Sequence, residues 1–285
     1  TDRTRAILPV HIYGMPCSMN EINAIARKHQ FAVVEDACQA WLAEYDGRKC
    51  GTLGDLGCFS FQESKHIPSG EGGAVVGMSE DLIDRCHSYH SCGRTVSDKH
   101  AIGSGFATRG MNYRMTQFQA ALLLQQFEKL QKETAVRRAN ADYLSANLGS
   151  IPGITPVRLP ENSRAVWHLY PFRYDAAGFN GLTRDKFMEA LRAEGVSCSS
   201  PYREQYFDGL LDEAINSRGF KRLWSAGRLK AYRESLNDLK GNKQACETTV
   251  AFFQNMLLAD RTAMNEILEA IRKIQAHSAE LAKAA

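Results

Sequence analysis

The sequence predicts an α/β fold with a mostly parallel sheet, followed by a smaller α+β domain. Three observations support this. Residues 31–34 form a short run of apolar side chains, which is typical of a strand buried on both faces of a parallel sheet. Two capping-box patterns each precede apolar residues at helical spacing. A glycine- and proline-rich stretch at residues 149–156 then separates the two parts.

The first part alternates helices and strands. A capping box at residues 18–21 opens a helix, and a strand at residues 31–35 follows it. Further strands are expected at residues 58–61 and 74–77, with another helix around residues 82–86. This alternation favours a sheet whose strands run mostly in parallel.

A second capping box, at residues 116–119, begins a long helix that extends to about Leu148. Its apolar positions recur every three or four residues: Ala120, Leu123, Leu124, Phe127 and Leu130. Gly149 ends the helix and begins the glycine- and proline-rich break. We therefore predict one domain over residues 1–150 and a second over residues 151–285.

The second part begins with a strand at residues 165–174. Thr183 then caps a helix that stops at Gly195. An apolar stripe over residues 264–274 marks the C-terminal helix, where core packing is the expected role. A strand flanked by helices in this order indicates an α+β domain.

Composition agrees with a soluble enzyme. The chain has 285 residues, 44% of them hydrophobic, and this is enough to build two cores. A net charge of +3 without a basic block gives no sign of nucleic-acid binding. No apolar run approaches the ~20 residues that span a bilayer, so no membrane association is expected.

The eight cysteines include no C-x-x-C pair, which favours reduced thiols in a cytoplasmic protein. One cluster, at residues 86–92, contains two cysteines and two histidines. On a helix Cys86 and His90 share a face, whereas His87 and Cys92 diverge from it. We therefore predict no metal site. A metal ion bound by this cluster is the weaker alternative.

The order of polar residues between positions 36 and 73 is what a pyridoxal phosphate site requires. This cofactor needs an amine that holds it as a Schiff base, an anion that keeps its ring nitrogen protonated, and donors for its phosphate. Lys65, Asp36 and Ser60 can supply these three functions. Asp36 follows an apolar strand at its carboxyl end, where open α/β sheets bind their ligands. Each residue alone is more often a helix cap or a solvated side chain, so the inference depends on their joint order.

The chain resembles the DegT-type sugar aminotransferases, which are fold-type I pyridoxal phosphate enzymes. The resemblance is carried by five short motifs: PVHIYG at residues 9–14, EDACQA at 35–40, GD at 54–55 with FSF at 59–61, Lys65 with GEGG at 70–73, and GMNYRM at 110–115. It implies a large cofactor-binding domain and a smaller C-terminal domain. It also implies transfer of an amino group from glutamate or glutamine to a keto-sugar or keto-cyclitol.

The resemblance assigns a role to each matching residue. Lys65 corresponds to the Schiff-base lysine and Asp36 to the partner of the pyridine nitrogen. Gln39 corresponds to the side chain beside the ring hydroxyl, and Ser60 to a phosphate donor. Asn112 corresponds to an asparagine that reaches the phosphate of the neighbouring subunit, which implies a homodimer.

The identity of the substrate that accepts the amino group is left open. His11, Tyr13 and Tyr202 resemble positions that line the family's substrate pocket, although burial and ordinary aromatic packing explain them equally well. Residues 62–65 resemble the branch that aminates scyllo-inosose-like cyclitols. Residues 112–114 resemble the nucleotide-sugar branch instead.

Family members normally begin well before the equivalent of Thr1, and the earlier segment carries phosphate-binding amides and a side chain that stacks on the ring. The chain is therefore expected to be a fragment. Two alternatives to a transaminase follow: a catalytically inactive remnant with a binding or regulatory role, or a sugar dehydratase of the same fold. Retention of Lys65, which the dehydratases replace with histidine, argues against the second.

Overall fold

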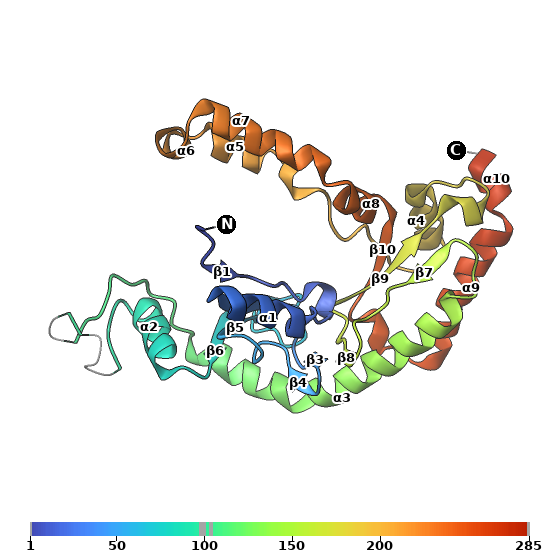
Figure 1. Cartoon of the computed structure of the whole chain (residues 1–285). Helices are drawn as coiled ribbons and strands as arrows, with labels where there is room; N and C mark the ends of the chain where they lie inside the picture. Colours follow the sequence, from blue (N-terminus) through green and yellow to red (C-terminus); the bar gives the residue numbers. More distant parts are fainter. Residues whose placement is uncertain (1, 97–100, 103–104, 284–285) are drawn as a thin grey trace. The chain divides into compact units, whose positions relative to one another are not determined.

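The computed structural model describes residues 2–96, 101–102 and 105–283 (Figure 1). Its contacts divide the chain into two compact units. Unit 1 comprises the chain up to Asp142 together with Arg158–Tyr170 and Gln254–Ala259. Unit 2 comprises Tyr143–Val157, Pro171–Phe253 and the chain from Asp260 onward. Each unit thus takes in chain from both sides of residue 150, and the division into residues 1–150 and 151–285 stays a prediction.

Unit 1 is built on a four-stranded sheet in the order β1-β2-β5-β6. Its strands are β1 (Ala6–Ile7), β2 (Ala32–Asp36), β5 (Leu56–Ser60) and β6 (Gly73–Gly77). The first three run parallel, and β6 pairs with β5 in the antiparallel direction. The predicted α/β fold with a mostly parallel sheet is confirmed.

The register of the sheet decides which side chains share a face. Asp36 lies opposite Cys58, and Ser60 lies two residues further along β5. Because strand side chains alternate between faces, these three residues share one face. Val33 and Glu35 occupy the opposite face and are buried there, where Met19 and Ala26 of α1 join the same hydrophobic core.

Three helices accompany the sheet in unit 1: α1 (Met19–His29), α2 (Glu80–His90) and the first part of α3 (Gln117–Leu148). At the start of α3 the Gln119 N–H donates to the Thr116 hydroxyl at 3.3 Å, and the Gln119 carboxamide oxygen accepts the Thr116 N–H at 3.0 Å. This reciprocal pair is the predicted capping box. At α1, by contrast, Ser18 precedes the helix without a side-chain cap hydrogen bond.

Short elements complete unit 1. The 3-10 turn η1 (Ile12–Gly14) follows β1, and η6 (Met256–Leu258) lies in the returning segment. A small antiparallel sheet joins β3 (Glu44–Tyr45) to β4 (Arg48–Lys49) and β8 (Ser163–Arg164).

Unit 2 contains a three-stranded sheet in the order β10-β9-β7. The strands are β7 (Ile154–Pro156), β9 (Leu169–Tyr174), whose first two residues belong to unit 1, and β10 (Thr249–Phe253). Its larger helices are α4 (Arg184–Ala193), which Thr183 caps as predicted, and α9 (Arg261–Ala276). The remaining helical elements are η3 (Ala176–Phe179), η4 (Gln205–Phe207), α5 (Leu210–Asn216), α6 (Arg218–Leu223), α7 (Ala226–Ser235), η5 (Leu236–Asp238), α8 (Lys240–Thr248) and α10 (Ser278–Lys283).

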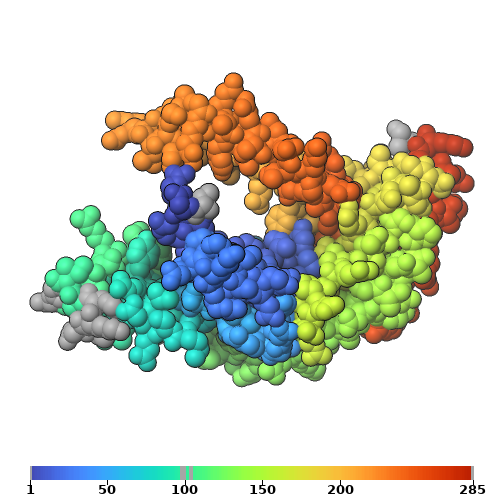
Figure 2. Space-filling view, in the orientation of Figure 1, coloured from blue at the N-terminus to red at the C-terminus, as the bar shows by residue number. Residues whose placement is uncertain are grey.

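The helices α5 to α8 were not anticipated from the sequence. In the space-filling view their orange atoms form an elongated arm of unit 2, and most of their side chains are exposed (Figure 2). Across the described residues, none of the helices combines the length and apolarity that a bilayer crossing requires.

Candidate active site

The site is built first from the ends of two neighbouring parallel strands. Asp36 ends β2 and Ser60 ends β5, and both side chains are half-buried on the same face of the sheet. The Asp36 carboxylate accepts the backbone N–H of Cys38 at 3.1 Å. The Ser60 hydroxyl accepts the backbone N–H of Gln62 at 3.2 Å, and this leaves its own hydrogen free to donate.

An aromatic cluster holds Ser60 in place. The Trp41 indole N–H donates to the Ser60 carbonyl oxygen at 3.1 Å. The Trp41 ring stacks on Phe59, with centroids 4.2 Å apart, and on Phe61, with centroids 5.4 Å apart. Such ring pairs stabilise beyond their buried area, so they help to fix the position of the end of β5.

Lys65 lies in a short loop that closes directly after Ser60. Its backbone N–H donates to the Gln62 carbonyl oxygen at 2.9 Å, and the Gln62 carboxamide oxygen accepts the N–H and the hydroxyl of Ser64. The Lys65 side chain is half-buried, and among the described residues its amine makes no ion pair.

Cys38 links Lys65 electrostatically to Asp36. Burial raises the pKa of the Cys38 thiol to about 12; the Asp36 carboxylate contributes to this rise, whereas the positive charge of Lys65 opposes it. A charge acts on a thiol in this way only over a short distance. Both predicted residues, Lys65 and Asp36, thus influence the pKa of the same thiol.

Gln39 and Tyr13 also come together. The Gln39 carboxamide oxygen accepts the Tyr13 backbone N–H at 2.7 Å. Tyr13 has a φ of 61°, which is the left-handed region that side chains other than glycine rarely adopt. The hydrogen bond stabilises this strained turn, and both residues remain half-buried.

His11 faces away from this group. Its ring is completely buried, with Nε2 2.8 Å from Oε2 of Glu35 and Nδ1 accepting the Cys17 N–H at 3.0 Å. Both ring nitrogens are therefore engaged by the protein, and the predicted contact of His11 with substrate gains no support from this geometry. The partner, Glu35, was not singled out in the sequence beyond its place in the strand.

Two buried histidines lie close to Lys65. The rings of His66 and His168 are edge to face, with centroids 5.9 Å apart. Burial lowers the pKa of His66 to about 3, with the charge of Arg137 adding to this effect. Burial and the charge of Lys65 lower the pKa of His168 to about 4. Both imidazoles are therefore neutral near pH 7.

Two further residues were predicted for the site, Asn112 and Tyr202. Asn112 is exposed and pairs with Ser91 in an isolated bridge, and its carboxamide oxygen accepts the Arg114 N–H at 3.4 Å. Tyr202 belongs to unit 2, where it is half-buried in the loop after Ser199.

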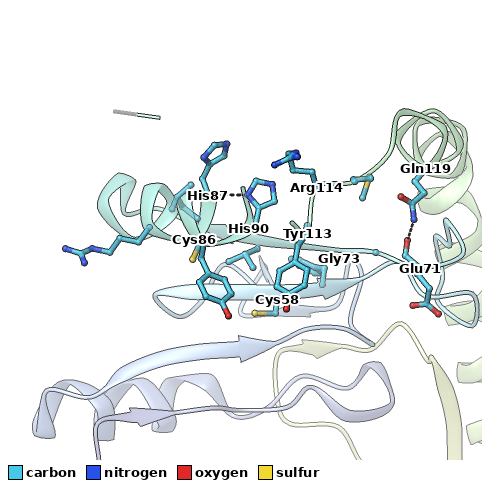
Figure 3. A pocket seen from close by; sticks show the side chains of 17 residues that line it. Cys58, Glu71, Gly73, Cys86, His87, His90, Tyr113, Arg114 and Gln119 are labelled. Atoms are coloured by element: carbon cyan, nitrogen blue, oxygen red, sulfur yellow. Dashed lines mark hydrogen bonds between the residues drawn. The ribbon is translucent and has the colours of Figure 1, made fainter. Parts of the chain in front are cut away.

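A cavity of about 1030 Å³ opens between β6, α2 and the segment before α3 (Figure 3). Cys58, Tyr113 and Arg114 are among its lining residues, whereas none of the predicted site residues lines it. The His87 carbonyl oxygen accepts the ring N–H of His90 at 2.7 Å beside it. Among the described residues, no three His, Cys, Asp or Glu side chains gather as metal ligands, here or elsewhere.

The residues present fit pyridoxal phosphate. Within the described chain, the Asp36 carboxylate is half-buried and forms no ion pair, so it can pair with a protonated ring nitrogen. Ser60 can donate to a phosphate oxygen, and the amine of Lys65 is unpaired. The fold and this site together define a protein of the class of pyridoxal phosphate enzymes.

The chain belongs to the DegT/DnrJ/EryC1/StrS aminotransferase family, whose model matches residues 1–217. Members of this family use pyridoxal phosphate, which confirms the predicted cofactor. The family assigned from the short motifs is confirmed as well.

The chain is similar to two enzymes with cyclitol substrates in their names. It is 32% identical over 287 residues to a putative L-glutamine:3-amino-2,3-dideoxy-scyllo-inosose aminotransferase of Streptomyces kanamyceticus, covering 99% of this chain and 67% of the relative. It is 33% identical over 290 residues to the L-glutamine:2-deoxy-scyllo-inosose aminotransferase of Micromonospora echinospora, with the same coverage. The chain therefore spans about two thirds of the length of these relatives.

A solved structure agrees with the fold. The aminotransferase from Psychrobacter cryohalolentis superimposes with a TM-score of 0.79 at 28% identity, covering 97% of this chain and 70% of that one.

Proposed function

We propose that this chain transfers amino groups from glutamine or glutamate to a keto-cyclitol or keto-sugar, using pyridoxal phosphate held by Lys65. The observation that carries the proposal is that Asp36 and Ser60 share one face of the sheet at the ends of β2 and β5, with Lys65 in the loop that directly follows Ser60. The family to which the chain belongs, and the names of its relatives, support amino-group transfer.

When bound, pyridoxal phosphate supplies an aromatic ring that accepts electrons from the substrate carbon. Asp36 would hold the ring nitrogen in its protonated form through the charge of its carboxylate. Ser60 would donate to the phosphate, and Gln39 would be the side chain next to the ring hydroxyl. Nζ of Lys65 would hold the cofactor, and its amine would move a proton to and from the substrate carbon.

The substrate and its binding residues are also proposals. Glutamine is the donor named for both relatives, and a cyclitol ketone is the acceptor that they favour. Tyr13 is a candidate for contact with the acceptor because it is half-buried and adjoins Gln39. Tyr202 remains a second candidate, from unit 2. For His11 we propose an indirect role, in which it fixes the chain before Tyr13.

The proposed assembly is a homodimer. Asn112 is exposed and lies ahead of α3, so it is available to a neighbouring subunit. Asn112 would then donate to the phosphate in the partner's site. A cytoplasmic location agrees with eight cysteines that are all free.

The test is a half-reaction with each amino donor. The protein is loaded with pyridoxal phosphate, mixed with glutamine or glutamate, and followed by absorbance. Asp36→Asn keeps the size of the side chain but removes its charge, so it is expected to slow the half-reaction by several powers of ten, each worth ~1.4 kcal/mol. Equal rates in the two proteins would make Asp36 a structural residue and overturn the proposal. A loaded protein that is inert to both donors would favour the catalytically inactive alternative.

A further inference from the structure

The side chain of Gln254 contacts the backbone on both sides of Lys65. Its amide nitrogen donates to the carbonyl oxygens of Ser64 at 3.0 Å and of Lys65 at 3.2 Å. These carbonyls belong to the two peptide groups that flank the Lys65 Cα atom. Because each peptide group is planar, holding both restricts φ and ψ of Lys65. The direction in which the lysine side chain leaves the backbone is thereby set.

The chemistry of the contact fixes the orientation of the Gln254 amide. Only its NH₂ group can donate to two carbonyl oxygens, so the amide oxygen must point the other way. That oxygen is buried and has no partner among the described residues. An apolar side chain of similar size would bury no unpaired amide oxygen, and packing alone therefore does not account for a glutamine here.

Gln254 begins a segment that is anchored to helix α3. This segment, Gln254–Ala259, returns the chain from β10 to unit 1. The buried Asn140 of α3 donates from its amide nitrogen to the carbonyl oxygens of Leu257 and Ala259, both at 2.9 Å. Helix α3 thus anchors the segment that orients the lysine loop.

We propose that Gln254 is a positioning residue that fixes the direction of the Lys65 side chain without touching cofactor or substrate. The inference rests on the proposed function of Lys65. It adds a residue 189 positions away in the sequence to the machinery of the site.

The test compares Gln254→Glu and Gln254→Ala with a matched control. Glutamate has the shape of glutamine but presents acceptors to the two carbonyls, and alanine removes the contact. The control is Gln275→Ala, because Gln275 makes the same kind of paired contact in unit 2, with the carbonyl oxygens of Pro152 at 2.7 Å and Gly178 at 3.2 Å. If Gln254→Glu does not fold, Gln254→Met replaces it. Methionine keeps the length of the side chain but lacks the NH₂ donor, so the same results are expected.

The first readout needs no cofactor. The amines are acylated with acetic anhydride, and mass spectrometry gives the rate at Lys65 relative to Lys129, which is 54% exposed on α3. Releasing the loop should expose the half-buried Lys65, so both Gln254 variants are expected to raise this ratio at least about fivefold, as loss of two hydrogen bonds permits. Gln275→Ala should leave the ratio unchanged.

The second readout is the rate at which borohydride fixes a pyridoxyl group on Lys65 after pyridoxal phosphate is added. It should fall in both Gln254 variants and not in the control. A Gln254→Glu protein that matches the wild type in both readouts would overturn the inference, because shape alone would then suffice. If the wild type acquires no pyridoxyl group at Lys65, the proposed function fails, whereas the acylation ratio still decides the role of Gln254.

Discussion

Nε2 of His11 lies 2.8 Å from Oε2 of Glu35, and both side chains are completely buried. The Nδ1 atom of His11 accepts the Cys17 N–H, so Nε2 carries a proton and donates to Glu35. Glu35 accepts three further N–H groups, from Gly51, Leu53 and Gly54. Burial by itself would raise the pKa of Glu35, but the hydrogen bond from His11 and those from the backbone outweigh it and lower the pKa.

The first prediction concerns this buried anion. Glu35→Gln leaves one oxygen and one NH₂ group to face four donors, so at least two donors lose their acceptor. We expect a loss of about 2–4 kcal/mol in the free energy of unfolding. Urea denaturation measures it, with the exposed Glu63→Gln as control. A loss below that of the control would show that the charge of Glu35 is unimportant.

A second prediction uses Cys38 to report on the cofactor residues. Asp36 adds to the raised pKa of the Cys38 thiol and Lys65 opposes it. Asp36→Asn should therefore lower this pKa, and Lys65→Ala should raise it further. Alkylation at pH 9 should be at least about tenfold faster in Asp36→Asn, and slower in Lys65→Ala. The exposed Cys92 serves as the internal reference. Shifts in the same direction for both variants would contradict the geometry.

The third prediction is a pH dependence of stability. The pKa of His66 is about 3 in the folded protein, against 6.5 for an unperturbed histidine. Between these values the unfolded state binds a proton that the folded state does not, so stability falls as the pH falls. From pH 7 to pH 5 this contribution is about 2 kcal/mol.

His66→Gln provides the measurement, because glutamine can still donate to the Val166 carbonyl oxygen and does not titrate. Urea unfolding at pH 7 and pH 5 should show a smaller loss in His66→Gln than in the wild type. The matched variant of the exposed His29 should behave as wild type. An unchanged loss in His66→Gln would mean that this imidazole is protonated in the folded state.

A fourth prediction tests the proposed dimer. If Asn112 serves the partner's site, mixing Lys65→Ala and Asn112→Ala subunits creates hybrids with one intact site. After random exchange about a quarter of all sites should be intact, as two-fold symmetry requires. Tight cofactor binding should return to that extent on mixing. A monomer in sedimentation that nevertheless binds the cofactor tightly would rule the dimer out.

Local patterns in the sequence were sufficient for much of the fold, and they supplied the candidate residues of the site. The apolar run ending at Asp36 predicted β2, because buried parallel strands have that composition. The capping box at Thr116 predicted the start of α3, where both side-chain contacts are formed. Lys65 and Asp36 were placed by motifs that lie close together along the chain.

Contacts between distant residues could not be predicted in this way. Gln254 meets Lys65 only because the chain returns from β10, and no periodicity indicates such a return. His66 and His168 are separated by about a hundred residues, and nothing in the sequence around either one indicates that the two rings meet. The hydrogen bonds of Glu35 could not be predicted either. Strand alternation gives the face on which a side chain lies, but it does not show which N–H groups meet it there.

The central claim is that Lys65 is the amine that holds pyridoxal phosphate. It is tested most directly by incubating the protein with pyridoxal phosphate, reducing with borohydride, and mapping the pyridoxyl group by peptide mass spectrometry. We expect the group on Lys65 alone, and its disappearance in a folded Lys65→Ala protein. A pyridoxyl group on another lysine at the same stoichiometry, persisting in Lys65→Ala, would contradict the account.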